Sequence, residues 1–217
     1  MEDLPPFNED LLLTYDTETL VHYIEASPKS KDSLSVNLLS TNFIPKGTAK
    51  TWEKDGLKAM ELAQELHVRV PDIRRIVEWE GTIYVIMERI HGSNLYDYWH
   101  ELGWFTTLKL TFQLRGFIHR IRSRTSLTAG ALYSGEAKSV WIDDYYRLPL
   151  HASPESVAAF FNFWGNFLPP WSTDSLTYGK VYFSPDQFVF SHQDLAPRNM
   201  LIVKKNNLWL VDWDFAG

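Results

Sequence analysis

The sequence predicts a mixed α+β protein with two lobes, and the distribution of its local patterns supports this. Short strand-like runs dominate the first ninety residues, whereas helical periodicity dominates the middle of the chain. Strand-like runs return near the C-terminus around a group of polar residues. This segregation is typical of α+β folds. We expect an N-terminal lobe over residues 1–90, made of an antiparallel sheet and a helix, and a mainly helical C-terminal lobe over residues 91–217.

The composition excludes several classes of site and partner. The 217 residues include no cysteine, which excludes disulfides, thiolate metal ligands and thiol nucleophiles. A net charge of −6 argues against nucleic acid or an anionic membrane as the main partner. The N-terminus has no basic segment ahead of an apolar one, and no apolar run reaches membrane-spanning length. The expected location is therefore cytoplasmic.

The N-terminal lobe is predicted to contain four short strands and one clear helix. The strand-like runs are Ser35–Leu39, Asn42–Lys46, Ile73–Trp79 and Thr82–Arg89. Pro45 lacks a backbone N–H, which predicts that its strand lies at the edge of a sheet or contains a bulge. Apolar residues at helical spacing predict a helix over Glu53–Leu66. Residues 1–30 are acidic and show only weak helical patterning.

Three helices are predicted in the C-terminal lobe. Ser93 offers an N-cap for a short helix over Leu95–Leu102, and Thr106 offers one for the longest helix. Ser153 followed by Pro154 is typical of a third helix start. One stripe of the longest helix is apolar, and its members are Leu110, Leu114, Phe117, Ile118 and Ile121.

Four polar residues near the C-terminus carry the strongest functional signal. His192, Asp194 and Asn199 form a His-x-Asp-x-x-x-x-Asn loop between two apolar runs, and Asp212 follows the second run. Phosphoryl transfer needs a carboxylate that orients the attacking hydroxyl, together with an amide and a second carboxylate that hold Mg²⁺. Asp and Asn also serve as turn-forming residues, but the full order favours the functional interpretation. We expect an architectural role for His192.

Asp212 has a competitor in Asp214. On a strand continuing through both residues, the two carboxylates would share one face. The spacing favours Asp212 as the metal ligand.

These residues make the chain similar to the aminoglycoside phosphotransferase-like kinases, which typically show His-Gly-Asp-Leu-x-Pro-x-Asn followed by Ile-Asp-Trp-Glu. Here the corresponding segments are His192–Asn199 and Val211–Asp214. The resemblance implies a protein-kinase-like two-lobed fold with a C-terminal lobe that is shorter than usual. It also implies ATP and Mg²⁺ as cofactors, with Asp194 as the catalytic base and with Asn199 and Asp212 as metal ligands.

The resemblance extends into the N-terminal lobe. Tyr84–Gly92 resembles the last strand and hinge of the family, which implies that Met87, Glu88 and Ile90 contact the adenine. Leu39–Lys46 resembles the strand whose lysine binds the phosphates, which points to Lys46.

Three features depart from the family pattern, and the third, the early end of the chain, is taken up below. No glycine-rich loop precedes Lys46, because the first glycine is Gly47. The helix acid that would pair with Lys46 stays open between Glu53, Asp55 and Glu61.

The resulting prediction is an ATP- and Mg²⁺-dependent phosphotransferase that acts on a hydroxyl of a small molecule. The alternative is a pseudokinase-like nucleotide-binding or interaction protein with little catalysis. The chain stops five residues after Asp212, where the family continues with further helices. We therefore expect part of an apolar face to lie uncovered, either the stripe of the longest helix or the aromatic stretch Phe160–Phe167. Self-association, a partner or a local rearrangement of residues 150–190 would then cover it.

Overall fold

The computed structural model describes residues 5–31, 33, 35–139, 142, 147–165, 187–204 and 206–217, without the side chains of residues 49–53. The chain forms two compact units, and each is described by itself. The first unit comprises Met1–Lys54, Arg69–Gln113 and Ala196–Val211. The second unit comprises Asp55–Val68, Leu114–Leu195 and Asp212–Gly217. The division into lobes at residue 90 stays a prediction.

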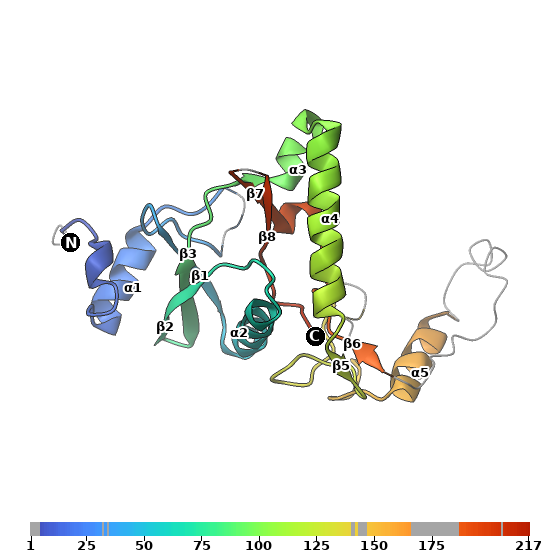
Figure 1. The fold of residues 1–217 in the computed structure, drawn as a ribbon. Helices are drawn as coiled ribbons and strands as arrows, with labels where there is room; N and C mark the ends of the chain where they lie inside the picture. Colours follow the sequence, from blue (N-terminus) through green and yellow to red (C-terminus); the bar gives the residue numbers. More distant parts are fainter. Residues whose placement is uncertain are drawn as a thin grey trace. The chain divides into compact units, whose positions relative to one another are not determined.

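Helices and short antiparallel strands make up both units, which confirms the mixed α+β class (Figure 1). The helices are η1 (Glu9–Leu11), α1 (Thr17–Ala26), α2 (Lys50–Glu65), α3 (Leu95–Tyr98), η2 (Trp99–Glu101), α4 (Trp104–Ile121), α5 (Pro154–Gly165) and η3 (Pro197–Asn199). The strands are β1 (Phe43–Ala49), β2 (Ile73–Trp79), β3 (Thr82–Glu88), β4 (Ser93–Asn94), β5 (Thr125–Ser126), β6 (Phe188–Val189), β7 (Met200–Val203) and β8 (Asn207–Leu210). Among the described residues, no helix is both long enough and apolar enough to cross a membrane.

A three-stranded antiparallel sheet with the order β1-β3-β2 is the main element of the first unit. Glu80 and Gly81 have φ angles of 47° and 81°, so both residues of the β2–β3 turn are left-handed, as the tightest hairpins require. Pro45 lies in β1 at the sheet edge, as predicted. The predicted strand Ser35–Leu39 is wrong, because this segment makes only isolated bridges, such as that between Val36 and Lys46.

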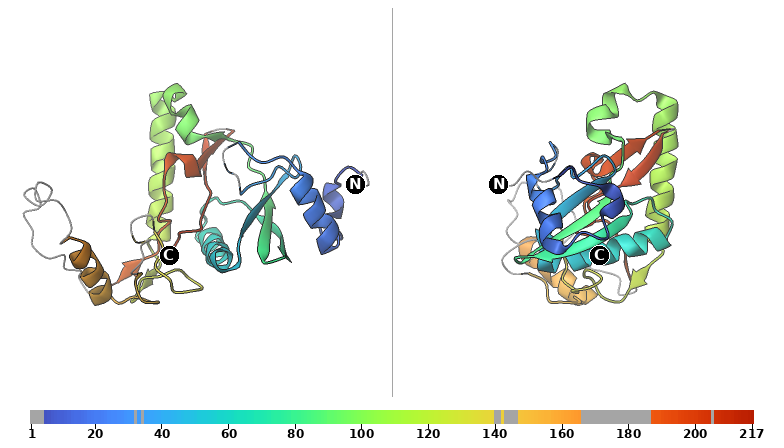
Figure 2. Two further views of the ribbon diagram at one scale, coloured as in Figure 1. Left: turned by 180° about the vertical axis from the view of Figure 1, so that it is seen from behind. Right: turned by 90° about the vertical axis from the view of Figure 1, so that its left-hand side faces the viewer.

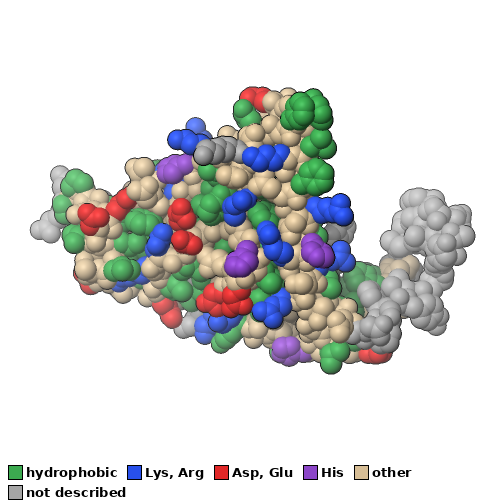
Figure 3. Space-filling view, viewed as in Figure 1, with side chains coloured by type: hydrophobic (Ala, Val, Ile, Leu, Met, Phe, Trp, Pro, Cys, Tyr) green, Lys and Arg blue, Asp and Glu red, His purple; other side chains and the backbone are tan. Residues whose placement is uncertain are grey.

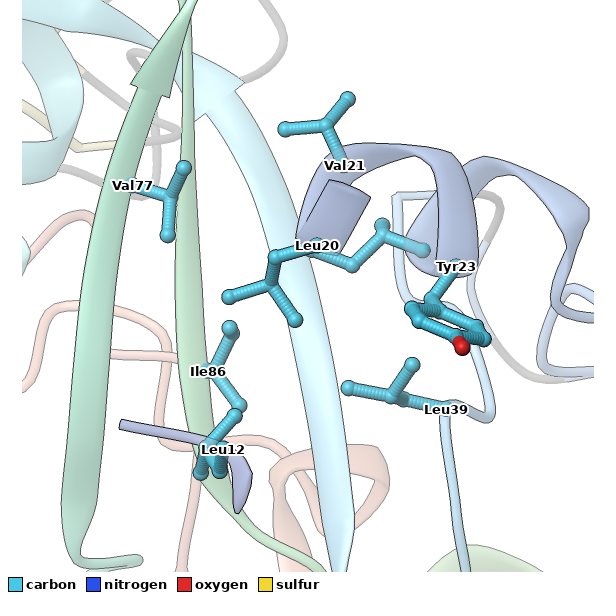
Figure 4. Close-up of a cluster of buried hydrophobic side chains, with 8 residues drawn as sticks. Leu12, Leu20, Val21, Tyr23, Leu39, Val77 and Ile86 are labelled. Atoms are coloured by element: carbon cyan, nitrogen blue, oxygen red, sulfur yellow. The ribbon is translucent and has the colours of Figure 1, made fainter. Parts of the chain in front are cut away.

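Helix α1 packs against this sheet and is more regular than its sequence pattern indicates. Asp16 caps its N-terminus by accepting a hydrogen bond of 2.8 Å from the backbone N–H of Thr19. Figure 2 (right) views the sheet with α1 in front of it. Figure 4 shows Leu20 of α1 directed toward Val77 and Ile86 of the sheet. The cluster of buried side chains there comprises Leu12, Leu20, Val21, Tyr23, Ile24, Leu39, Val77 and Ile86.

A second small sheet of the first unit has the order β4-β7-β8. The adjoining α3 is capped by Asn94, whose side chain accepts a hydrogen bond of 2.8 Å from the N–H of Tyr96, and not by Ser93. The predicted cap of the longest helix is also wrong. Helix α4 begins at Trp104, and the hydroxyl of Thr106 instead accepts a hydrogen bond of 3.1 Å from the side-chain amide of Asn206.

In the second unit, α5 begins as predicted. Pro154 is its first residue, and the Oγ of Ser153 accepts a hydrogen bond of 3.3 Å from the N–H of Ser156. A small apolar core surrounds the start of α5 and includes Leu148, Ala152 and Val157. The two-residue strands β5 and β6 of this unit pair with each other in antiparallel orientation.

The apolar stripe of α4 is not the exposed face. Leu110, Phe117 and Ile121 are buried, which contradicts the expectation that this stripe lies uncovered. Other large side chains of α4 are exposed instead, and they are Trp104, Phe105, Leu108 and Phe112. Figure 3 shows hydrophobic side chains gathered at this end of the helix. In α5, Phe163 and Trp164 are exposed, in line with the second alternative for an uncovered face.

Candidate functional site

The segment that follows β6 lies beside the last residues of the chain. Ser191 and Gly217 exchange two backbone hydrogen bonds, of 2.9 and 3.0 Å. The ring centroids of His192 and Trp213 are 4.5 Å apart, and both residues are buried. These contacts, all within the second unit, bring the loop that carries Asp194 alongside the segment that carries Asp212. His192 is thus packed against Trp213, and the architectural role expected for it stays a prediction.

The two aspartates differ in their surroundings. Asp194 is half-buried and Asp212 is exposed. Asp212 has a φ of 65°, in the left-handed region that residues other than glycine seldom adopt, although Asp tolerates it better than most. Backbone strain of this kind concentrates at functional sites, where the surroundings must enforce it.

Asp214 is distinguished from Asp212 by its neighbours. No strand continues through both residues, because β8 ends at Leu210 and Asp214 lies in a turn. A Cβ added at Gly56 of α2 would lie 3.2 Å from the Oδ1 of Asp214, so this carboxylate packs against the helix. Asp212 is therefore the acid that is turned to solvent.

Asn199 belongs to the first unit, where the β7–β8 hairpin positions it. It ends η3 and is buried, and its carbonyl accepts a hydrogen bond of 3.0 Å from the N–H of Val211. Val211 is the residue that precedes Asp212 in the chain. An amide oxygen and a carboxylate are suitable ligands for Mg²⁺, which keeps several waters and needs few protein groups. The described residues contain no cluster of three or more His, Cys, Asp or Glu that could hold a metal.

The residues predicted to bind nucleotide lie on neighbouring strands of the first unit. In the β1–β3 ladder, Lys46 pairs with Val85 and Ile44 pairs with Met87. Glu88 ends β3, and its N–H donates a hydrogen bond of 2.9 Å to the carbonyl of Asp72. Ile90 follows β3 and is half-buried. The sheet thus places the lysine and the expected hinge on adjacent strands, whereas Asp194 and Asp212 belong to the second unit.

Asp55, a candidate partner of Lys46, is fully buried with 0% exposure and has other partners. Its Oδ1 accepts hydrogen bonds from the backbone N–H groups of Tyr133 and Ser134, at 3.1 and 2.8 Å. Its Oδ2 accepts from the hydroxyl of Ser134 at 2.8 Å and from the ammonium of Lys138 at 2.6 Å. A carboxylate has about four acceptor positions. These donors fill them, so we do not assign Asp55 to Lys46.

The charge of Asp55 is maintained by its donors. Burial raises the pKa of Asp55, but the bond from Lys138 and those from Ser134 outweigh it and hold the pKa below its usual value. Of the other candidate acids, Glu61 forms an exposed pair with Lys58 at 2.6 Å. Glu53 lies where side chains are not described.

Sequence reasoning missed Ser134 and Lys138 because neither belongs to a periodic pattern or a motif. It also gave no weight to Gln193, which precedes Asp194 and has a φ of 63°. The sequence did offer one indication of its importance: Gln193 lies directly before the expected base, where the similar family has a glycine.

Comparison with known proteins adds no relative: the chain matches no protein-family model, and a comparison with curated proteins finds no significant match.

Proposed function

We propose that the chain is an ATP- and Mg²⁺-dependent phosphotransferase that transfers a phosphoryl group to a hydroxyl of a small molecule. The observation that carries this proposal is the pairing of Ser191 with Gly217 and of His192 with Trp213. Through these contacts, Asp194 and Asp212, which are 18 positions apart in the sequence, lie on adjacent segments, as phosphoryl transfer requires. A protein-kinase-like two-lobed fold, with lobes over residues 1–90 and 91–217, is part of the same proposal.

Each predicted residue has a role in this mechanism. The carboxylate of Asp194 accepts the proton of the acceptor hydroxyl as its oxygen attacks the terminal phosphorus, and the bond to the leaving ADP breaks. Asn199 and Asp212 would hold Mg²⁺, and the ion would supply neutralising charge at the phosphates. Lys46 binds the phosphates, and Met87, Glu88 and Ile90 contact the adenine.

A nucleotide-binding protein with little catalysis is the second candidate, and the partners of Asp55 favour it. Kinases position their lysine with an ion pair to a helix acid. Because Asp55 is saturated by Lys138 and its neighbours, the Lys46 side chain lacks one of its three candidate acids. We further propose a cytoplasmic location and self-association through exposed apolar side chains such as those of Phe163 and Trp164.

Nucleotide binding tests both candidate functions at once, because each of them requires it. At a nucleotide concentration a hundredfold above its dissociation constant, MgATP should stabilise the fold by about 2.7 kcal/mol. The measurement is the melting temperature with and without millimolar ATP, in Mg²⁺ and in EDTA. A melting temperature that is indifferent to MgATP would contradict the kinase and the binding protein together.

Two conservative variants then separate binding from turnover. Asp194→Asn changes the proton acceptor but hardly the shape, so turnover should fall by about 10²–10⁴-fold while nucleotide binding persists. Asp212→Asn should weaken the Mg²⁺-dependent binding itself, because a neutral amide is a poorer ligand for a hard cation. ADP release and calorimetric binding are the two readouts. Equal effects of both variants on binding would refute this division of roles.

A further inference from the structure

A cavity of about 280 Å³ lies wholly within the second unit, beside the loop that carries Asp194. Its volume is at the lower limit of the roughly 300–1,000 Å³ found for small-molecule sites. Most of its wall is apolar, and Leu62, Ala131, Leu132, Phe188 and Phe190 contribute to it. An occupant must therefore be compact and largely apolar, since a multi-ring sugar would not be enclosed.

The cationic side chains at the cavity carry acidic partners. The ammonium of Lys138 lies 2.6 Å from the Oδ2 of Asp55 and 3.9 Å from the Oε2 of Glu136. The guanidinium of Arg124 lies 3.5 Å from the Oε2 of Glu65. Because both charges are already compensated, the cavity offers little attraction to an anion. The occupant that it fits is uncharged.

Two residues on the cavity wall are held in a strained backbone conformation. Gln193 has a φ of 63° and His151 a φ of 52°, where glycine would be accommodated without strain. The ring of His151 packs directly over Gly135, where a Cβ would overlap it, and the N–H of His151 donates a hydrogen bond of 2.7 Å to the Gly135 carbonyl. Strain at such positions points to a function for the side chains that it places.

Gln193 supplies a polar group at this wall. Its Nε2 donates a hydrogen bond of 2.6 Å to the Oγ of Ser191, and within the described part of the chain its Oε1 makes no hydrogen bond. The amide oxygen of Gln193, an exposed side chain, can therefore accept a hydrogen bond from a ligand hydroxyl. Asp194 is the next residue, with its Cα about 3.8 Å from that of Gln193.

We infer that this cavity binds the phosphoryl acceptor, and that the acceptor is a small, uncharged, largely apolar alcohol whose hydroxyl is oriented by Gln193. The inference rests on the proposed function and adds the substrate class to it. The apolar body of the alcohol lies against the wall formed by Leu62 and Phe188. Its hydroxyl lies at the Gln193 end, beside the expected base.

The first experiment measures binding in the absence of nucleotide. Calorimetry compares 2-phenylethanol with phenylacetate, phenethylamine and glucose as ligands of the full chain. We expect saturable binding of 2-phenylethanol and at least tenfold weaker binding of the other three. Equal binding of the charged or polyhydroxylated compounds would overturn the inference.

A matched pair of variants then locates the binding. Leu132 lines the cavity and is 43% exposed, whereas Leu108 is 45% exposed and belongs to the first unit. Leu132→Trp should weaken 2-phenylethanol binding at least tenfold, and Leu108→Trp should leave it unchanged. Gln193→Gly should weaken binding without lowering the melting temperature, because glycine relieves the left-handed strain. The inference fails if the two tryptophan variants bind alike.

Turnover distinguishes this inference from the proposed function. With MgATP present, 2-phenylethanol should give ADP, and Leu132→Trp should reduce kcat/KM at least tenfold. Binding without any ADP formation would leave the cavity as a ligand site and refute the phosphotransferase. ADP formation with glucose that Leu132→Trp does not change would keep the phosphotransferase and refute the cavity as the acceptor site.

Discussion

The two units hold their elements in place by different means. In the first unit, α1 is fixed to its sheet by apolar side chains such as Leu20 and Ile86. In the second unit, the loop from Tyr133 to Lys138 is fixed by the buried carboxylate of Asp55, 83 positions before Lys138. Apolar burial is non-directional, whereas a buried charge depends on each of its partners. The second unit should therefore be the more sensitive to loss of a single polar group.

Removing one partner of the buried ion pair gives the largest expected effect on stability. Lys138→Met leaves the carboxylate of Asp55 buried without its cation, which should lower the free energy of unfolding by about 3–5 kcal/mol. Urea denaturation measures this change, and amide hydrogen exchange should locate it in the second unit.

The matched control is an ion pair of equal length at the surface. Lys58 and Glu61 are also 2.6 Å apart, but both side chains are more than half exposed. Lys58→Met should therefore cost no more than about 1 kcal/mol. Equal decreases in the free energy of unfolding for the two variants would show that burial does not determine how much the Asp55–Lys138 pair contributes to stability.

An apolar truncation tests the first unit. Leu20 is fully buried between α1 and the sheet, so Leu20→Ala should lower the free energy of unfolding by about 2–5 kcal/mol, depending on how far the cavity collapses. Leu13→Ala is the control, because Leu13 is 72% exposed and its truncation should change stability by less than about 0.5 kcal/mol. A small loss for Leu20→Ala would mean that α1 is not held by this cluster.

The pH dependence of stability should distinguish the buried ion pair of Asp55 in the second unit from the apolar cluster around Leu20 in the first. The folded pKa of Asp55 is depressed, so its stabilisation is present above the unfolded pKa of about 3.9 and is lost as pH falls through the folded value. The difference in free energy of unfolding between the wild type and Asp55→Asn should shrink as pH is lowered from 7 to 3. The difference between the wild type and Leu20→Ala should stay constant, because no titrating group is removed. A constant difference for Asp55→Asn would contradict the depressed pKa.

Elements specified by local pattern were predicted well. The hairpin β2–β3, the edge strand with Pro45 and the start of α5 at Pro154 follow from periodicity, from missing backbone donors and from capping residues. Helix α1 was underestimated, because its regularity depends on packing against Val77 and Ile86 of distant strands. The start of α4 was misplaced, since Thr106 binds Asn206 rather than the helix N-terminus.

The residue types of the candidate site could be predicted from the sequence, but its backbone conformation could not. Asp194 and Asp212 stand out by their spacing, yet the left-handed φ of Asp212 has no local signal in the sequence. The ion pair of Asp55 and Lys138 has no local sequence signal either, because residues 83 positions apart form no helical or strand-like periodicity. Long-range polar contacts of this kind determine which acid pairs with a given lysine. Sequence spacing alone therefore does not identify the acid that pairs with Lys46.

The smallest predicted effect concerns the N-terminus of α1 and asks how far local interactions support that helix. The carboxylate of Asp16 accepts hydrogen bonds of 2.8 Å from both the N–H and the hydroxyl of Thr19, and these bonds lower the pKa of Asp16. Asp16→Ala removes the cap and should cost about 1 kcal/mol, whereas Asp16→Asn retains an acceptor and should cost only a few tenths. Chemical denaturation measures the loss, and amide exchange in α1 shows whether it stays local. If Asp16→Ala costs nothing, the apolar face of α1 alone holds the helix, and the contrast with the polar anchoring at Asp55 becomes sharper.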